Sequence, residues 1–190
     1  MAKSAFKEYR EKRNFETTPE PEDGKDLELD TESPIFVIQK HHFTRDQYFL
    51  RLESHGVLKS WRIPDGITMN PNEEQFARQE ENHPLGYADF EGKIPEDSLN
   101  KGKVMICDRG NYENIKVSTR KTIQKDIKEG KVQIWLNGER VQGGFELKKF
   151  ELGEEKWLFK KLKDKHADPK DSLEQEFKSS LVSEKKIAEI

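Results

Sequence analysis

The sequence predicts a mainly β protein, a compact closed antiparallel barrel flanked by one or two short helices. Several apolar segments have the length of strands, turn signals separate them, and almost no helix or repeat period lies between them. Only 32% of the 190 residues are hydrophobic, and these concentrate between Ile35 and Leu162. We therefore expect a barrel domain over residues 35–165, between a helix with an acidic connector (1–34) and a charged tail (166–190).

The N-terminal segment has the pattern of a short helix followed by an extended connector. Phe6, Tyr9 and Arg13 recur at near-helical spacing behind a serine that can cap a helix. We expect this helix, over residues 4–13, to pack on the domain. The residues that follow, up to Pro34, are rich in proline, glycine and acids, which predicts an extended connector.

Strand signals begin at Ile35. The run IFVIQ is continuously apolar, YFLRLE alternates in part, and GVLKSWRIP ends at a proline, which a central strand cannot accommodate. KVMICD, KVQIWLNG and KWLFKKL are later strand candidates, and Asn137-Gly138 indicates a hairpin. Most of the ordered chain is therefore expected to be β.

Two later segments have helical spacing. Thr119–Glu129 has isoleucines four residues apart and is followed by a glycine that can stop a helix, so we expect a helix there. In the tail, Leu173, Phe177 and Leu181 recur every four residues. This pattern fits a weakly amphipathic helix and equally a solvated tail with fluctuating helicity.

Composition narrows the classes of function. The net charge is -3, but residues 35–165 carry 24 basic and 21 acidic side chains, a balance that permits phosphate contact without requiring it. The single cysteine, Cys107, excludes an internal disulfide and a cysteine-only zinc site, and its apolar surroundings predict a buried, inert thiol. No apolar run approaches the ~20 residues that span a bilayer, and the N-terminus lacks the apolar core of a signal peptide. We expect a cytoplasmic monomer.

Polar side chains able to carry chemistry gather on the second predicted strand. Arg51 and Glu53 lie two residues apart, so they share a face with Gln47 and Phe49. The planar donors of an arginine can bind two phosphate oxygens at once. A cross-strand Arg–Glu pair at the surface explains the same residues without any function.

A second group lies in the turn-rich segment NHPLGYADFEGKIPE, which holds His83, Tyr87, Asp89 and Glu91. A single histidine in such a segment is more often a surface or hydrogen-bonded structural residue than a catalytic one. No glycine-rich phosphate loop, HExxH motif, serine nucleophile elbow or cysteine pair occurs in the sequence.

Several motifs, in order, resemble the 3′-phosphoesterase domain of bacterial DNA ligase D and its stand-alone archaeal relatives. They are FVIQKH, RLE followed by GVLKSWRIP, HPLGYADFEGKIPE, the DRG at 108–110 and KWLFKKLKD, with YREKRNFETTPEP at the N-terminal side. The resemblance runs from about Phe6 to about Asp164. It implies a β-barrel and a manganese-dependent activity in DNA repair by non-homologous end joining. That activity removes a ribonucleoside and then a 3′-phosphate from a primer-template and leaves a 3′-hydroxyl.

The resemblance also implies roles for individual residues. His41 matches the first metal histidine of the family, and Arg51 and His83 match its phosphate-contacting residues, so with Tyr87 they form the implied catalytic set. The remaining matches, implied to support substrate binding, are Arg13, Glu20, Gln39, Glu53 and Glu81.

The metal site departs from the family pattern, which is His, five residues, His, one residue, Asp. The same spacing here gives His41, Gln47 and Phe49. Gln47 offers only a neutral carbonyl oxygen, whereas Phe49 offers no lone pair and fills volume that a metal and its water would need. Asp46 has the wrong strand parity to replace the lost acid. We expect manganese affinity to fall by orders of magnitude.

Two functions follow from this combination. The leading hypothesis is a phosphoesterase-fold protein with lost or severely weakened metal-dependent catalysis. Such a protein would recognise a DNA or RNA 3′ end, or a ligase, polymerase or Ku-like repair partner. The alternative is an active, divergent manganese-dependent enzyme that heals 3′ ends with other ligands. A metal-free reaction would need His41 and His83 as base and acid around Arg51. A scaffold with an inactive leftover site is a third interpretation.

Overall fold

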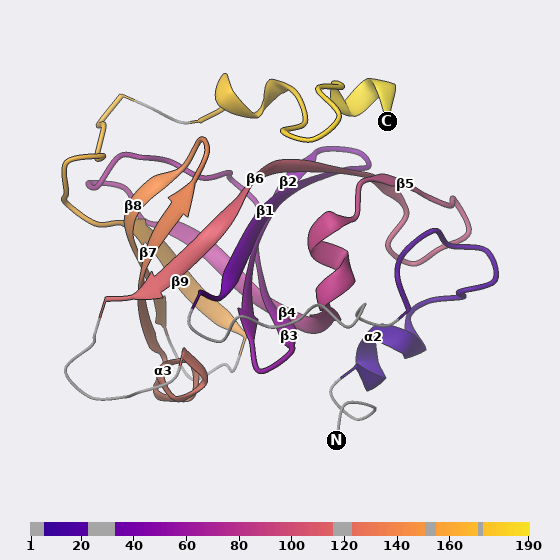
Figure 1. Ribbon diagram of the computed structural model, residues 1–190, viewed down its shortest axis with the longest axis horizontal. Helices are drawn as coiled ribbons and strands as arrows, with labels where there is room; N and C mark the ends of the chain where they lie inside the picture. The colour runs from indigo at the N-terminus through magenta and orange to yellow at the C-terminus, as the bar shows by residue number, and fades with distance from the viewer. Residues whose placement is uncertain (1–5, 23–32, 116–122, 151–154, 171–172) are drawn as a thin grey trace.

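The computed structural model describes residues 6–22, 33–115, 123–150, 155–170 and 173–190. It is an antiparallel barrel with the sheet order β1-β2-β3-β4-β9-β8-β7-β6-β5 (Figure 1). The strands are β1 Ile35–His42, β2 Asp46–Ser54, β3 Val57–Ile63, β4 Gln75–Pro84, β5 Gly92–Ile94, β6 Gly102–Asn114, β7 Lys131–Gly138, β8 Gln142–Lys149 and β9 Lys156–Lys161. Pairing of β1 with β6 closes eight strands into the barrel and leaves β5 as an extra strand, which confirms the predicted fold class.

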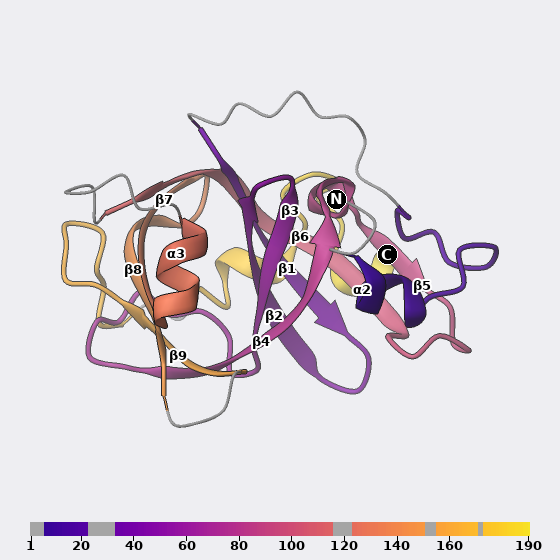
Figure 2. The same ribbon diagram turned by 90° about the horizontal axis from the view of Figure 1, so that it is seen from below.

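Short helices flank the barrel on different sides. They are α2 Lys7–Glu11 and α3 Ile123–Glu129, with single 3-10 turns at η1 Leu85–Asp89, η2 Glu176–Lys178 and η3 Ile187–Glu189. Figure 2 shows α3 beside β7 and α2 on the other side, near β4. The first part of the helix predicted over 119–129 lies outside the described residues, as do residues 4 and 5 of the predicted N-terminal helix. Among the described residues, no helix is long and apolar enough to cross a membrane.

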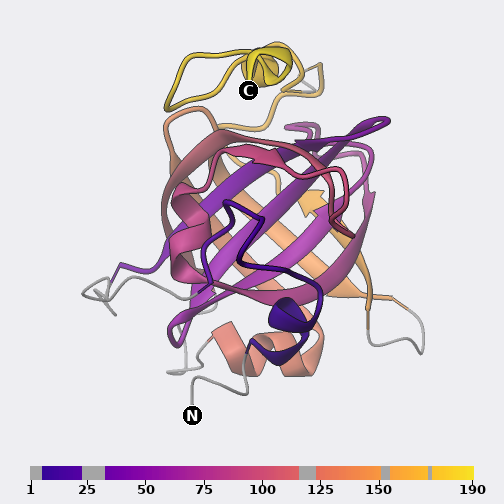
Figure 3. The ribbon, with the colours of Figure 1, turned by 90° about the vertical axis from the view of Figure 1, so that its right-hand side faces the viewer.

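The tail follows neither pattern considered from the sequence. Figure 3 shows it lying across one end of the barrel, where Leu173 and Phe177 are buried in the barrel core. The Phe177 ring lies 5.9 Å from the ring of Tyr48. Only one 3-10 turn forms around Phe177, because its backbone leaves the helical region there. The apolar spacing therefore reflects the burial of Leu173 and Phe177 in the end of the barrel rather than the apolar face of a helix.

Strand β4 was not predicted, because QFARQEENHP lacks alternating apolar residues. Its backbone pairs with β3 on one side and β9 on the other. The barrel cannot close without a strand at this position, so backbone hydrogen bonds fix β4 although its local pattern is polar. This strand presents Glu80, Glu81 and His83 to the site described below.

The barrel wall separates two apolar clusters. Inside, alternate residues such as Ile38, Leu50 and Trp61 form the main core. Outside, the wall of β1 to β4 is covered by the N-terminal segment and η1, which bury a second cluster that includes Tyr9 and Tyr87 (Figure 3). The outward residues of β1 and β2 thus face a protein cover, and polar residues among them are shielded from bulk water.

Asp108, in the DRG motif, holds the β7–β8 hairpin. Its buried carboxylate accepts hydrogen bonds from the backbone N–H groups of Glu139 (3.0 Å), Arg140 (3.2 Å) and Val141 (2.7 Å). The predicted hairpin is present, and its loop consists of residues 139–141, directly after Gly138. The neighbouring Cys107 is buried, as predicted, and burial raises the pKa of its thiol to about 12. The DRG motif is therefore a structural element of the barrel.

We predict that Asp108→Ala lowers the free energy of unfolding by about 3 kcal/mol, because three backbone donors, one of them fully buried, lose a charged acceptor. Urea denaturation followed by circular dichroism measures this change. Asp97→Ala, at an exposed position, is the control and should change stability by less than ~0.5 kcal/mol. An equal loss in the two variants would contradict the structural role of Asp108.

Candidate functional site

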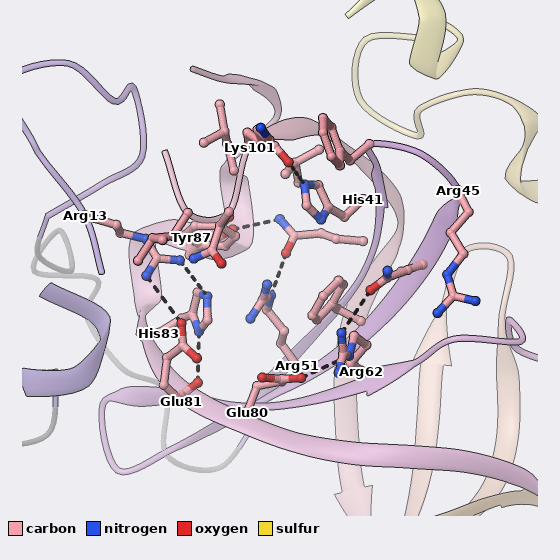
Figure 4. A pocket seen from close by; sticks show the side chains of 18 of the residues that line it. Arg13, His41, Arg45, Arg51, Arg62, Glu80, Glu81, His83, Tyr87 and Lys101 are labelled. Carbon is pink, nitrogen blue, oxygen red and sulfur yellow. Dashed lines mark hydrogen bonds and ion pairs between the residues drawn. The ribbon is translucent and has the colours of Figure 1, made fainter. Parts of the chain in front are cut away.

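A cavity of about 270 Å³ opens on the covered outer wall of the barrel (Figure 4). Its floor comes from β1 to β4, and its rim from the β1–β2 loop and from residues 99–101, which precede β6. The sequence-predicted residues in its lining are Arg13, Gln39, His41, Gln47, Phe49, Arg51, Glu81, His83 and Tyr87. Predicted residues from the three strands β1, β2 and β4, from the N-terminal segment and from η1 thus meet in one pocket.

Strand alternation places these side chains on one face. In β2, Gln47, Phe49 and Arg51 point to the pocket, while the residues between them are buried in the barrel core. The β1–β2 register sets His41 opposite Gln47, and Gln39 opposite Phe49. Side chains directly opposite on neighbouring strands are in contact range, so the strand register determines which side chains meet on the pocket floor.

Arg51 occupies the centre of the floor (Figure 4) and is 4% exposed. Its Nε donates to Oε1 of Gln39 (2.7 Å), and its Nη1 donates to Oγ of Ser60 (2.6 Å). The guanidinium carbon lies 5.0 Å from the ring centre of Phe49 and 4.7 Å from that of Tyr87. The group is therefore held in one orientation between two aromatic rings.

No described carboxylate forms an ion pair with Arg51. Burial is the main effect that lowers the pKa of its guanidinium. The sequence-level alternative of an Arg51–Glu53 surface pair is not observed, because the Glu53 carboxylate instead accepts from the backbone N–H of Gly56 (3.3 Å). Glu53 lines a different groove, so the structure separates it from the other predicted site residues. A buried guanidinium without a carboxylate partner is costly unless an anion compensates it.

Gln39 connects Arg51 to the covering segment. Its Nε2 donates to the carbonyl oxygens of Tyr87 and Phe90 (2.9 Å each). These bonds leave its Oε1 directed at Arg51, so the amide orientation is set by the network. Gln39 is thus a positioning residue for the guanidinium.

Arg13, in contrast, is fully compensated. Its Nε donates to Oε1 of Glu20 (2.9 Å), its Nη1 lies 3.3 Å from Oε1 of Glu81, and its side chain is 3% exposed. The Tyr87 hydroxyl donates to the same Glu20 oxygen (3.0 Å). The guanidinium also stacks 3.7 Å from the ring centre of Tyr9. This network fastens the N-terminal segment to the pocket wall and leaves Arg13 no free charge.

His83 is buried between the rings of Tyr9 and Tyr87, whose centres lie 4.9 Å and 4.6 Å from its own. Its Nδ1 donates to the carbonyl oxygen of Glu81 (3.0 Å), so Nε2 carries the lone pair and faces Nη2 of Arg13 (3.4 Å). Burial first, and then the charges of Arg51 and Arg13, lower the pKa of His83 well below its ordinary value. His83 is therefore a neutral imidazole at pH 7.

His41 lies on the other side of Arg51 in Figure 4. Its Nε2 donates to the carbonyl oxygen of Lys101 (3.1 Å), which leaves Nδ1 as the ring's lone pair. Burial is the largest effect that lowers the pKa of His41. The two histidines are thus neutral together, and neither is charged to act as a general acid at pH 7.

The donor set does not fit the divalent metal of a phosphoesterase. Gln47 Oε1 accepts from Nη1 of Arg62 (3.3 Å), and the Phe49 ring centre lies 6.2 Å from that of His41. Arg62 is the cross-strand partner of Phe49 and also lies 3.0 Å from Oε1 of Glu80. Within the described residues, no cluster of three His, Cys, Asp or Glu side chains could hold a metal ion. The ion pair between Arg62 and Glu80 lies in this part of the pocket instead.

The pocket as a whole is electropositive. Five cationic side chains line it against two carboxylates, Glu80 and Glu81; the cations are Arg13, Arg45, Arg51, Arg62 and Lys101. Among the described residues, no ion-pair partner is found for Arg45, Arg51 or Lys101. An excess of unpaired cations in a concave site favours an anionic ligand.

Several residues of the site were not anticipated from the sequence, namely Ser60, Arg62, Glu80 and Lys101. Ser60 and Arg62 lie two apart on β3, so strand alternation alone could have placed them beside each other. Two predicted polar residues lie elsewhere: Asp89 pairs with Arg109 at the surface, and Glu91 accepts from the backbone of Ile106.

Fold and site together define an antiparallel barrel with an electropositive pocket on its outer wall. The profile of the DNA Ligase D 3′-phosphoesterase domain matches residues 39–149, which is more than half of the chain. This chain therefore belongs to the family of DNA ligase D 3′-phosphoesterase domains, as its motifs predicted. The family is metal-dependent in general.

Curated relatives agree with this assignment. The chain is 35% identical over 184 residues to the "Multifunctional non-homologous end joining protein LigD" of Pseudomonas aeruginosa, covering 95% of this chain and 21% of that protein. It is 36% identical over 162 residues to the "Multifunctional non-homologous end joining DNA repair protein LigD" of Mycobacterium tuberculosis, covering 82% of this chain and 19% of that protein. This chain thus spans about a fifth of the length of these relatives.

We predict that acid destabilises the protein through His83. In the folded state its pKa is lowered, whereas in the unfolded chain it is about 6.5, so the unfolded state binds a proton first as pH falls. The free energy of unfolding should therefore drop between about pH 7 and pH 5. His83→Gln should make this dependence shallower, whatever its stability at pH 7.

Urea titrations at a series of pH values measure that slope. His55→Asn, at an exposed turn histidine, is the control and should keep the slope of the unmodified protein. An unchanged slope in His83→Gln would show that His83 is not the group responsible.

Proposed function

We propose that this protein recognises phosphate-bearing 3′ ends of DNA in end-joining repair, and that its metal-dependent phosphoesterase chemistry is lost or severely weakened. The observation that carries the proposal is the buried Arg51 guanidinium, oriented by Gln39 and Ser60 and paired with no described carboxylate. A primer-template 3′ end is the ligand class that the family suggests. The ligase or polymerase of a larger repair protein, or a Ku-like protein, is the partner class.

A phosphate fits this guanidinium better than other small ligands do. Arg51 uses two of its five N–H donors on Gln39 and Ser60, which leaves donors for the paired oxygens of a phosphate. The guanidinium lies near the aromatic rings of Phe49 and Tyr87 and is almost fully shielded from bulk water. An ionic hydrogen bond is stronger in such a setting than in water.

Two features support the loss of catalysis. A divalent metal would have to bind one imidazole and an amide already engaged by Arg62, and the positive charge of Arg62 would repel it. A metal-free reaction would need a charged imidazole as its acid, and burial lowers the pKa of both His41 and His83, which disfavours that form. We infer that the pocket retains recognition of the 3′-phosphate end without the means to remove that phosphate.

We predict that Arg51→Gln weakens binding of a 3′-phosphorylated primer-template by about 10- to 100-fold, since an ionic hydrogen bond contributes about 1.5–3 kcal/mol. Binding of the same duplex with a 3′-hydroxyl should be weaker in the unmodified protein and nearly unaffected by the substitution. Fluorescence anisotropy at low and at physiological salt measures both, because backbone contacts alone are strongly salt-dependent.

Arg109→Gln is the matched control, since Arg109 is an exposed arginine paired with Asp89 outside the pocket. It should bind like the unmodified protein. Thermal unfolding checks that each variant is folded. Ser60→Ala removes only a residue that orients Arg51, so its affinity for the 3′-phosphorylated duplex should lie between those of Arg51→Gln and Arg109→Gln. Equal binding of both duplex ends by folded, unmodified protein would overturn recognition of the 3′-phosphate.

We predict that manganese-dependent catalysis can be restored in two stages. Gln47→His with Phe49→Asp rebuilds the family ligand set, but the new aspartate would face Arg62 and form an ion pair with it. Adding Arg62→Ala removes this competitor and frees Glu80. Manganese affinity by calorimetry, and conversion of a labelled primer-template to a 3′-hydroxyl, should both rise from the double to the triple variant.

The unmodified protein is the reference in this assay, on ends that carry a 3′-phosphate or one ribonucleotide. Conversion that needs manganese and is lost in His83→Ala would mean an active, divergent 3′-end-healing enzyme and would overturn the proposed loss of catalysis. A triple variant that folds and binds DNA but takes up no manganese would show that more than these ligands has been lost.

A further inference from the structure

The rim of the pocket carries an exposed aromatic ring beside unpaired cations. Phe43, in the β1–β2 loop, is 47% exposed, and Arg45 lies two residues further along the same loop. Next to this loop, the segment before β6 contributes Lys101 and Leu99, which is 79% exposed. Figure 4 shows Lys101 beside His41 and Arg45 at the margin of the pocket.

Lys101 contacts Phe43, so the segment before β6 and the β1–β2 loop meet at the rim. The Lys101 ammonium lies 4.9 Å from the centre of the Phe43 ring. Neither Lys101 nor Arg45 has an ion-pair partner in the part of the chain that the structure describes. A solvent-facing ring with cations on the same pocket rim is the combination with which proteins hold single-stranded nucleic acid, because a base stacks on the ring while the cations follow the backbone.

We propose that Phe43 stacks on the 3′-terminal base of the bound strand, and that Arg45 and Lys101 contact the backbone phosphate that precedes it. This inference rests on the proposed function, since it requires that Arg51 hold the terminal phosphate. With that phosphate at the floor, the attached nucleotide must lie toward the mouth, where the ring and the two cations are. Stacking tolerates every base, so the rim favours no sequence.

A lone exposed phenylalanine would not support this inference, because scattered apolar residues are common on protein surfaces. Phe76, on β4, is such a residue: it is 37% exposed and lies outside the pocket. Phe43 differs because it lines the mouth of an electropositive cavity and contacts Lys101, which has no carboxylate partner among the described residues. The charge of the rim matches a polyanion rather than an apolar partner.

The experiment uses the full chain and two 3′-phosphorylated oligonucleotides that differ only in the last nucleotide, which carries 2-aminopurine in one and is abasic in the other. Phe43→Ala should weaken binding of the first about tenfold and leave binding of the second unchanged. Phe43→Trp should restore binding of the first, with quenching of the 2-aminopurine fluorescence on stacking. Phe76→Ala should match the unmodified protein with both.

The cations have a separate readout. Arg45→Gln and Lys101→Gln should each lower the dependence of log affinity on log salt by about 0.7 for a single strand, because one phosphate contact is lost in each. Binding of both oligonucleotides by Phe43→Ala with unmodified affinity would overturn the stacking inference. If Arg51→Gln still weakens binding in that case, the proposed function stands. No nucleic-acid binding by the folded protein at low salt would overturn both.

Discussion

The site depends on one buried guanidinium that the protein holds still without neutralising it. Gln39 and Ser60 take two donors of Arg51, and two aromatic rings cover its faces. Because Gln39 also binds the backbone of η1, the orientation of the guanidinium and the position of the covering turn depend on each other. Stability alone does not explain such an arrangement, since an unpaired buried charge costs free energy and a hydrophobic residue would pack at less cost. The phosphate ligand that we propose would compensate this charge.

The departures from the family's metal pattern form one connected change. Phe49 lies opposite Arg62 on the neighbouring strand, and Gln47 accepts a hydrogen bond from the same guanidinium. A carboxylate at the position of Phe49 would meet a cation from β3, and a metal ion bound there would meet the same charge. The loss of an anionic ligand and the presence of Arg62 therefore act in one direction. The positive charge at this position is then that of Arg62, which pairs with Glu80, rather than that of a bound metal ion.

Burial lowers the pKa of both pocket histidines, His41 and His83. His83 is among the most buried polar residues, packed against two tyrosine rings and facing Arg13, and these surroundings keep it neutral. Arg13 itself is bound by Glu20 and Glu81, so the N-terminal segment contributes a neutralised network rather than a free cation. Pairing with carboxylates thus distinguishes Arg13 from the equally buried Arg51, for which no described carboxylate partner is found.

The sequence by itself determined the barrel class, the faces of β1 and β2, and the presence of Gln47 and Phe49 at positions where the family resemblance implies metal ligands, because strand alternation and motif spacing are local properties. Only the tertiary structure decided that Arg62 stands against those two positions, that Glu53 lies outside the pocket and that the polar segment of β4 is a strand. Strand register and closure fix these features through contacts between residues distant along the chain. The tail shows the same limit: its apolar spacing was visible, but only the barrel end it covers explains it.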